Sequence, residues 1–327
     1  MEIIINTHGT HINKKQNRIL IKAGEEVRSI SIFDITAISI TKPCTISSEA
    51  IQLAARHKIA ISFIDATGKV QSKLWGTGYG SIATVRRKQI LFAQNNKFIE
   101  WVVEQLIKKT QNQKQVLKTY APKTYETFDT KTDALWYKIN QQKLPVTPNE
   151  IENFLNQIRG IEGVIGNWYW GNLRKTVKPE IKIGLRRQRP ATDAFNALLN
   201  YYYGMLYNYI ETSIITLGLD PYLAFLHTDQ YQEPTLAFDL IEQFRGWADG
   251  LVIQLFTKQT VKPQIDFDVL NSKYYYLNTT GKKKLIPKFN KMLSQTEKLS
   301  KQQIMRKNLI KREINELKKR INQTVQL

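Results

Sequence analysis

The stretch "YLAFLHTDQYQEPTLAFDLIEQF", residues 222–244, combines residue types that could bind a metal ion. It holds His227, one of only four histidines in the chain, and then Asp239 and Glu242 within an apolar helical pattern. A lone histidine is more often a hydrogen-bonded core residue than a ligand. An imidazole with carboxylates in reach suits Mg²⁺ or Mn²⁺, so we expect a divalent metal site here.

A third carboxylate comes from "RGIEGVIGNWYW", in which Glu162 lies in a helical pattern with Val164, Ile165 and Trp168. This pattern predicts burial, and a buried carboxylate requires a cation or a hydrogen-bond partner. Asp239, Glu242 and Asp249 share one stripe of the helix that begins near Thr235, and the alternative for these acids is that this stripe faces water. The apolar neighbours Phe238 and Ile241 favour the metal site over that alternative.

The other histidines give weaker signals. His8 and His11 in "THGTH" have the spacing of a metal pair, but a turn between two strands explains them with fewer assumptions. His57 lies on a predicted helix and is expected at the surface.

Basic residues gather near the same segments and favour a polyanionic partner. "IGLRRQRP" places Arg186, Arg187 and Arg189 in a loop before a helix, where guanidinium groups could hold phosphates. Residues 271–327 carry many more bases than acids, including Lys282, Lys283 and Lys284. This region contains a thin apolar stripe, so both a helix that follows phosphates and a packed helix remain open.

The bulk composition agrees with nucleic acid as the partner. The 327 residues carry 48 Lys plus Arg against 28 Asp plus Glu, a formal net charge of +20. No apolar run approaches the roughly 20 residues of a membrane span, and no secretory signal pattern opens the chain. Cys44 is the single cysteine, which rules out an intrachain disulfide. We expect a cytoplasmic protein that does not engage membranes.

The elements that must position these residues fall into two parts. Residues 1–75 are typical of short strands, separated by turn-like or polar segments such as "THGTH" and "NKKQN" and interrupted by one helix at "SSEAIQLAARHK". Helical periodicity follows over 84–118, 150–175, 192–217 and 235–256, whereas the prolines of 119–147 predict only short helical pieces.

The predicted fold class is therefore α+β, with a small β-sandwich-like domain followed by a larger all-α domain. We place the mainly-β domain at 1–78, a linker at 79–84, and a helical catalytic domain with a basic C-terminal region at 85–327.

Three ordered motifs resemble the CRISPR-associated protein 1 family, the integrases of CRISPR adaptation: "RGIEG" at 159–163, "GLDPYLAFLHTD" at 218–229 and "PTLAFDLIEQFR" at 234–245. "RPATDAFNALLNYYYGML" is also similar to a family helix and puts Asn196 at a matching place. The resemblance implies that Glu162, His227 and Glu242 bind Mg²⁺ or Mn²⁺, with Asp239 lining the site.

The same resemblance implies an activity and partners. The 3′-hydroxyl of a short double-stranded DNA fragment would attack a phosphodiester at the CRISPR repeat, and water in its place would nick the DNA. Arg186, Arg187, Arg189, Asn196 and Lys282–Lys284 are the expected DNA contacts. The family forms homodimers through its β domains and usually assembles with a small second CRISPR-associated protein.

Two other functions remain open at the level of sequence. A metal-dependent nuclease or a transposon-type integrase on the same fold would share every motif quoted. The net charge alone would also suit a non-catalytic DNA-binding scaffold.

Overall fold

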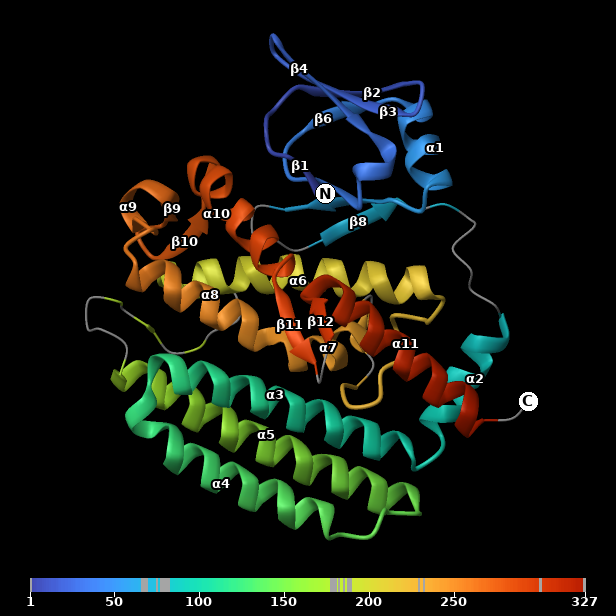
Figure 1. Cartoon of the computed structure of the whole chain (residues 1–327), viewed down its shortest axis with the longest axis vertical. Coiled ribbons are helices and arrows are strands. Elements are labelled where there is room, and N and C mark those ends of the chain that lie inside the picture. The colour runs from blue at the N-terminus through green and yellow to red at the C-terminus, as the bar shows by residue number, and fades with distance from the viewer. Residues whose placement is uncertain are drawn as a thin grey trace.

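The computed structural model describes residues 2–65, 70–74, 76, 83–176, 181, 183–184, 186, 190–228, 230–231, 233–299 and 302–325. Figure 1 shows strands at the amino-terminal end packed on a larger body of helices. The expected α+β class is therefore confirmed. The predicted linker at 79–84 lies mostly outside the described residues, and only Ala83 and Thr84 of it are seen, in the first turn of a helix.

Two four-stranded sheets form the amino-terminal domain. The first sheet has the order β1 (Glu2–Ile5), β5 (Ala37–Ile40), β7 (Ala60–Ile64) and β8 (Val70–Leu74), with β8 antiparallel to β7. The second has the order β4 (Glu26–Ser31), β3 (Arg18–Ala23), β2 (Thr10–Lys15) and β6 (Cys44–Ile46). Isoleucines dominate the core of this domain, with η1 (Ile32–Asp34) and α1 (Ser48–Arg56) completing it.

Strand β2 corrects one sequence interpretation. "THGTH" and "NKKQN" were expected only to separate strands, yet β2 runs from the end of the first into the second. Buried Thr10 and Ile12 alternate with exposed neighbours, which anchors a mostly polar strand between β3 and β6. His11 lies on this strand opposite Lys22 and His8 lies in the preceding turn, so the turn explanation holds only for His8.

The helical domain contains most of the chain. Its helices are α2 (Ala83–Ala93), α3 (Phe98–Tyr120), α4 (Pro122–Asn140), α5 (Pro148–Thr176), α6 (Ala194–Leu217), α7 (Thr235–Ile241), η2 (Glu242–Phe244), α8 (Arg245–Thr257), α9 (Pro263–Asp266), α10 (Thr279–Leu293) and α11 (Arg306–Thr324). Two small antiparallel sheets also occur in it, β9 (Phe267–Leu270) with β10 (Tyr274–Leu277), and β11 (Thr296–Leu299) with β12 (Gln302–Met305). These strands are an addition to the expected all-α domain.

The segment expected to be one helix over 84–118 is two helices. Residues 94–97 separate α2 from α3, because the two asparagines there satisfy other groups. The side chain of Asn95 accepts a bond from the backbone N–H of Lys97, and that of Asn96 donates to the carbonyl of Pro145.

The expectation of short helical pieces over 119–147 is wrong. Helix α4 runs for 19 residues, because Pro122 occupies its first turn, where a missing N–H costs nothing. Pro145 lies after its end, and Pro148 in turn begins α5.

The basic C-terminal helix is packed, which settles the alternative left open by its thin apolar stripe. Leu309, Ile310, Ile314, Leu317 and Ile321 of α11 are all buried in the core of the helical domain. Its charged residues cover the outer side, and Glu313 pairs with Lys108 of α3. Within the described residues, no helix is both long and apolar enough to span a bilayer.

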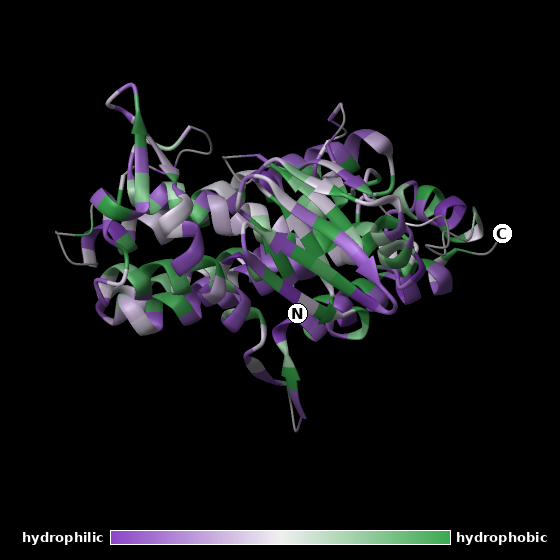
Figure 2. Cartoon of the chain, turned by 90° about the horizontal axis from the view of Figure 1, so that it is seen from above, coloured by the Kyte–Doolittle hydropathy of each residue, from purple (hydrophilic) through white to green (hydrophobic). Residues whose placement is uncertain are grey.

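The amino-terminal domain lies directly on α6. The Ser62 hydroxyl of β7 donates to Asn208 Oδ1 at 2.9 Å, and Lys73 Nζ of β8 lies 2.6 Å from Glu211 Oε2. Figure 2 shows hydrophobic and hydrophilic residues mixed along the strands seen from above, as expected of sheets with one buried face. This contact brings β8 to the edge of the cavity described next.

Candidate active site

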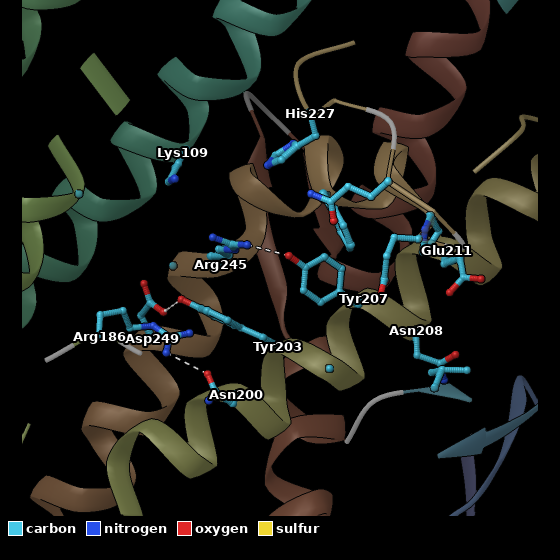
Figure 3. A pocket seen from close by; sticks show the side chains of 18 of the residues that line it. Lys109, Arg186, Asn200, Tyr203, Tyr207, Asn208, Glu211, His227, Arg245 and Asp249 are labelled. Carbon is cyan, nitrogen blue, oxygen red and sulfur yellow. Dashed lines mark hydrogen bonds between the residues drawn. The ribbon is translucent and has the colours of Figure 1, made fainter. Parts of the chain in front are cut away.

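A cavity of about 730 Å³ opens between β8, α3, α5, α6 and the segment before α7. Lys109, Glu162, Tyr203, Tyr207, His227, Arg245 and Asp249 line it, together with residues 70–73 of β8. Figure 3 shows Arg245, Tyr207, Tyr203 and Asp249 around this space, with His227 and Lys109 on one side of it. Of the four metal-site residues expected from sequence, Glu162 and His227 line the cavity. Asp239 and Glu242 do not line it, but Asp239 contacts His227, and Glu242 contacts Lys109 and Arg245.

Two of the expected ligands meet at one positive charge. Glu162 comes from α5 and Glu242 from η2, and the Lys109 ammonium from α3 lies between them. Its Nζ is 2.5 Å from Glu242 Oε2 and is also paired with Glu162 Oε1. Glu162 was expected to be buried and to need a cation or a hydrogen-bond partner. Lys109 is such a cation, but 36% of the Glu162 side chain is exposed. It lies on the cavity side of α5 with Gly166 and Trp170, whereas Val164, also expected to be buried, is exposed and does not line the cavity.

Glu242 is the more deeply buried of these two glutamates, with 5% of its side chain exposed. Burial raises the pKa of this carboxyl, but the charges of Arg245 and Lys109 outweigh it and hold the pKa at about 2. Arg245 Nη1 lies 2.9 Å from Glu242 Oε1, and its Nη2 donates to Tyr207 Oη at 2.7 Å. Glu242 is therefore ionised at neutral pH and is held by two cations.

Gly246 allows the helices that carry these groups to approach each other. A side chain at this position would bring its Cβ to 2.9 Å from Cβ of Asn112 on α3, a distance that real side chains do not adopt. Asn112 also donates to the carbonyl of Gln243 at 2.5 Å. This close approach brings Lys109, one turn earlier on α3, within reach of Glu242.

Asp239 fixes the loop that presents His227. Its carboxylate accepts hydrogen bonds from the backbone N–H groups of Phe225, Leu226 and His227 at 2.6–3.0 Å, and its Oδ1 lies 2.7 Å from His227 Nδ1. Only 2% of the Asp239 side chain is exposed, against 34% for His227. Because the Nδ1 atom is engaged, Nε2 is the nitrogen left for a ligand. Asp239 thus positions the histidine from behind.

The loop itself is irregular, with neither helix nor strand over residues 219–228. Phe225 packs among Phe92, Phe98 and Trp101, which explains the burial without a strand. Arg159, the first residue of "RGIEG", donates to the carbonyl of Leu226 at 2.6 Å. Two of the sequence motifs are therefore joined by a direct hydrogen bond.

Asp249 is a buried acid in the same cavity that the sequence placed on the carboxylate stripe without a role. Its two oxygens accept bonds from Tyr169 Oη at 2.9 Å and Tyr203 Oη at 2.5 Å. Burial outweighs these hydrogen bonds and nearby cations and raises the pKa of Asp249 to about 6.

We expect Asp249→Asn to stabilise the protein increasingly as pH rises. The pKa of this acid is higher in the folded protein than in the unfolded chain, so the folded protein binds its proton more tightly. The stability that this proton contributes is present below the unfolded pKa and is lost as pH rises through the folded pKa. From pH 4 to 7, the free energy of unfolding of the variant relative to wild type should rise by about 2–3 kcal/mol. Urea titrations across this range measure it, with Asp268→Asn at an exposed site as the control. A pH-independent difference would contradict the raised pKa.

Of the residues expected to contact DNA, Arg186 lines the cavity, and Asn196 lies behind it within hydrogen-bond distance. Arg186 donates to Asn200 Oδ1 at 2.9 Å and Asn196 Oδ1 at 3.3 Å, and its guanidinium lies over the ring of Tyr203. Asn196 is 1% exposed and binds the side chain of Asp193, the N-cap of α6. Its position suits it to orient Arg186, with no surface for a direct contact to DNA. Arg187 and Arg189 lie outside the described residues.

The three lysines of α10 occupy different environments. Lys282 is 4% exposed, lies over the ring of Tyr201, and has its pKa lowered by burial. Lys284 pairs with Asp266 at 2.5 Å. Lys283 is exposed, so it is the member of this set that can reach DNA from outside.

The sequence analysis did not identify Lys109 and Arg245 as site residues, although the sequence pattern around each of them indicates an ion pair. Val102, Leu106, Lys109, Gln113 and Val116 form the buried stripe of α3, so a lysine at this spacing indicates a buried partner of opposite charge. Arg245 ends the motif that contains Glu242 and follows it by three residues, the spacing of an intrahelical ion pair.

The donor set fits a divalent cation. Glu162 and Glu242 converge on one cation position, and Glu242 Oε2 is buried without an aligned hydrogen-bond donor. Carboxylate oxygens with an imidazole suit Mg²⁺ or Mn²⁺. In the parts of the chain that the structure describes, no three His, Cys, Asp or Glu side chains stand around one point, and the Lys109 ammonium occupies the position between the glutamates.

The fold and this site define a member of a known family. The family model for "CRISPR associated protein Cas1" matches residues 3–291, so the chain belongs to the Cas1 family. It is 28% identical over 259 residues to "CRISPR-associated endonuclease Cas1 2" of Saccharolobus solfataricus, covering 77% of this chain and 74% of the relative. It is 29% identical over 273 residues to "CRISPR-associated protein Cas1 3" of Methanobrevibacter ruminantium, covering 81% of each.

Solved structures agree on the fold. A Cas1 protein from Thermotoga maritima superposes with a TM-score of 0.81 at 19% identity, covering 98% of this chain and 97% of that one. A casposase bound to integration product gives 0.80 at 20% identity, covering 100% and 92%. A Cas6-RT-Cas1–Cas2 complex gives 0.79 at 17% identity, covering 99% of this chain and 35% of the other.

Proposed function

We propose that this chain is a spacer-acquisition integrase that also cuts DNA. The observation that carries the proposal is the convergence of Glu162 and Glu242 on one cation position in a cavity that His227 and Arg245 also line. Membership of the Cas1 family supports the same activity, as does the printed name of its relative from Saccharolobus solfataricus, an endonuclease.

The site residues divide into ligands and supporting groups. Glu162, Glu242 and the Nε2 atom of His227 would hold Mg²⁺ or Mn²⁺, which when bound supplies electrostatic stabilisation of the charge on phosphodiester oxygens. Asp239 holds the imidazole by its other nitrogen. Arg245, fixed by Tyr207 and Glu242, and Arg186, fixed by Asn200, add positive charge to the cavity where a phosphate would bind.

The reaction is a transesterification. The 3′-hydroxyl oxygen of a short DNA fragment forms a bond to phosphorus at the CRISPR repeat, and the bond from phosphorus to the 3′ oxygen of the target strand breaks. The attacking hydroxyl gives up its proton, and the leaving oxygen takes one up. One phosphodiester bond forms as another breaks, so their number is unchanged. With water as the attacking group, the same site nicks the strand.

The partners belong to the same proposal. Double-stranded DNA fits the net charge of +20, and the unpaired surface of Lys283 together with Arg187 and Arg189 supplies candidate phosphate contacts. A complex with a Cas2 protein follows the assembly named in a structural neighbour, a Cas6-RT-Cas1–Cas2 complex. The homodimer through the amino-terminal domain follows from the family resemblance.

Product analysis tests the function. The protein is incubated with a plasmid carrying a CRISPR repeat, a labelled short duplex with free 3′ ends and Mn²⁺ or Mg²⁺, with and without the Cas2 partner. Label joined to the plasmid supports the integrase, and cut plasmid without joining supports a nuclease. Joining without preference for the repeat supports a transposon-type integrase, and binding with neither product supports a scaffold.

A further inference from the structure

Lys109 is the chain's own cation at the position where the two glutamates meet. Only 9% of its side chain is exposed, and it comes from the buried stripe of α3. Its ammonium forms ion pairs with Glu162 Oε1 and Glu242 Oε2. Its contacts with both carboxylates mean that one positive charge serves two negative ones.

Removing that charge would leave Glu162 and Glu242 close together, with Arg245 as the one remaining ion-pair partner of Glu242 among the described residues. Like charges at such separation repel strongly in a partly buried site. Lys109 therefore keeps the two carboxylates together in the metal-free protein. It also occupies the position that a divalent ion shared by the same carboxylates would take.

We propose that Lys109 is a built-in competitor for the divalent ion, which keeps the metal-free site assembled and must leave the position between Glu162 and Glu242 for the ion to bind. This inference rests on the proposed metal site. The lysine thereby lowers the apparent affinity for the ion, because only the fraction of molecules with Lys109 displaced is competent to bind.

The surroundings distinguish Lys109 from the second cation. Arg245 is held by Glu242, by the hydroxyl of Tyr207 and by the rings of Tyr203 and Tyr207, so moving it breaks several contacts. Among the described residues, the hydrogen-bond and ion-pair partners of Lys109 are the two glutamates alone. The lysine and Gly166 both line the open cavity. Apart from the adjacent residues and the local helix backbone, no heavy atom of the described residues lies within 4 Å of the place that a Cβ on Gly166 would occupy.

Once the divalent ion has displaced it, the Lys109 ammonium is available for a second interaction. It stays on a flexible side chain beside the cavity where DNA would bind, and a phosphate is the anion available to it there. The same lysine would then balance the carboxylates before the ion binds and contact the nucleic acid afterwards.

Mn²⁺ titration calorimetry on the full chain, without DNA, tests the competition. Lys109→Met keeps the length and removes the charge, and we expect it to bind Mn²⁺ at least about tenfold more tightly than wild type. Its melting temperature without metal should fall below that of wild type, and Mn²⁺ should raise it by more. Lys109→Gln replaces the methionine variant if the latter does not fold without metal.

Two controls separate charge from packing. Lys109→Arg keeps the charge and should bind Mn²⁺ no more tightly than wild type, and a gain equal to that of Lys109→Met would overturn the proposal. Lys108→Met changes the adjacent lysine, whose partner is Glu313 away from the cavity, and should leave Mn²⁺ affinity unchanged.

The titrations also separate failure of this inference from failure of the metal site. If Glu162→Gln and His227→Ala lose Mn²⁺ binding but Lys109→Met binds as wild type does or more weakly, the competition is wrong and the metal site stands. If Glu162→Gln and His227→Ala bind Mn²⁺ as wild type does, the metal site is wrong and the inference fails with it.

Discussion

Replacing Glu162 with glutamine is expected to slow DNA joining by at least about 100-fold while leaving DNA affinity within about twofold. Glutamine has the same shape and can still bond to Lys109, so the fold around α5 should persist. It carries no charge, and the cation position between α5 and η2 then has Glu242 as its one carboxylate. Single-turnover joining rates and filter binding at fixed salt measure the two effects separately.

The control is Glu152→Gln, which makes the same change at an exposed position on the same helix. Its joining rate should match that of wild type. Wild-type joining by Glu162→Gln would remove Glu162 from the catalytic set. An equal loss of joining and of DNA affinity would make Glu162 a binding residue.

Replacing Asp239 with alanine is expected to lower the free energy of unfolding by about 3 kcal/mol or more and to abolish joining. The carboxylate accepts three backbone hydrogen bonds from residues 225–227 and one from the His227 ring, all in a buried setting. Alanine leaves those N–H groups without a partner and releases the histidine from its orientation. Urea unfolding curves and the joining assay record the two losses.

Asp239→Asn should remove only part of the hydrogen bonding. Its carbonyl oxygen can still accept hydrogen bonds, but the NH₂ group that replaces the other oxygen cannot accept those from the backbone N–H groups of Phe225 and Leu226. It should fall between wild type and Asp239→Ala in stability. Asp268→Ala, at an exposed position in β9, is the control and should change stability by less than about 0.5 kcal/mol. Stability of Asp239→Ala within that margin would show that the loop is held by the packing of Phe225 instead.

The sequence predicted elements well where a single periodicity dominated. The apolar patterns of α5 and α6 are long and regular, and the structure has both helices at the expected places. The sequence-based predictions failed where tertiary contacts determine the secondary structure. The polar strand β2 depends on pairing with β3 and β6, and the break before α3 depends on a side-chain bond to Pro145, far away in the chain.

For the site, too, the sequence predicted some features and not others. Motif order brought Glu162, His227 and Glu242 together as candidates, and the structure places all three at one cavity or in contact with its lining. Which acid faces the cavity and which lies behind the histidine was not readable, because it depends on the turn that Asp239 makes toward residues 225–227. Lys109 was missed because its partners come from two other helices.

Gly246 sets the spacing between α3 and α8, and this spacing determines how long the side chain at position 109 must be to reach Glu242. Because no Cβ separates α8 from Asn112, the gap from the α3 backbone to Glu242 equals the reach of one lysine. A bulkier residue at 246 would push α3 outward and leave that lysine too short for both carboxylates. The residue size at position 246 and the side-chain length at position 109 therefore depend on each other. A chain of this family with a larger residue at position 246 would need a longer cation, such as arginine, at position 109.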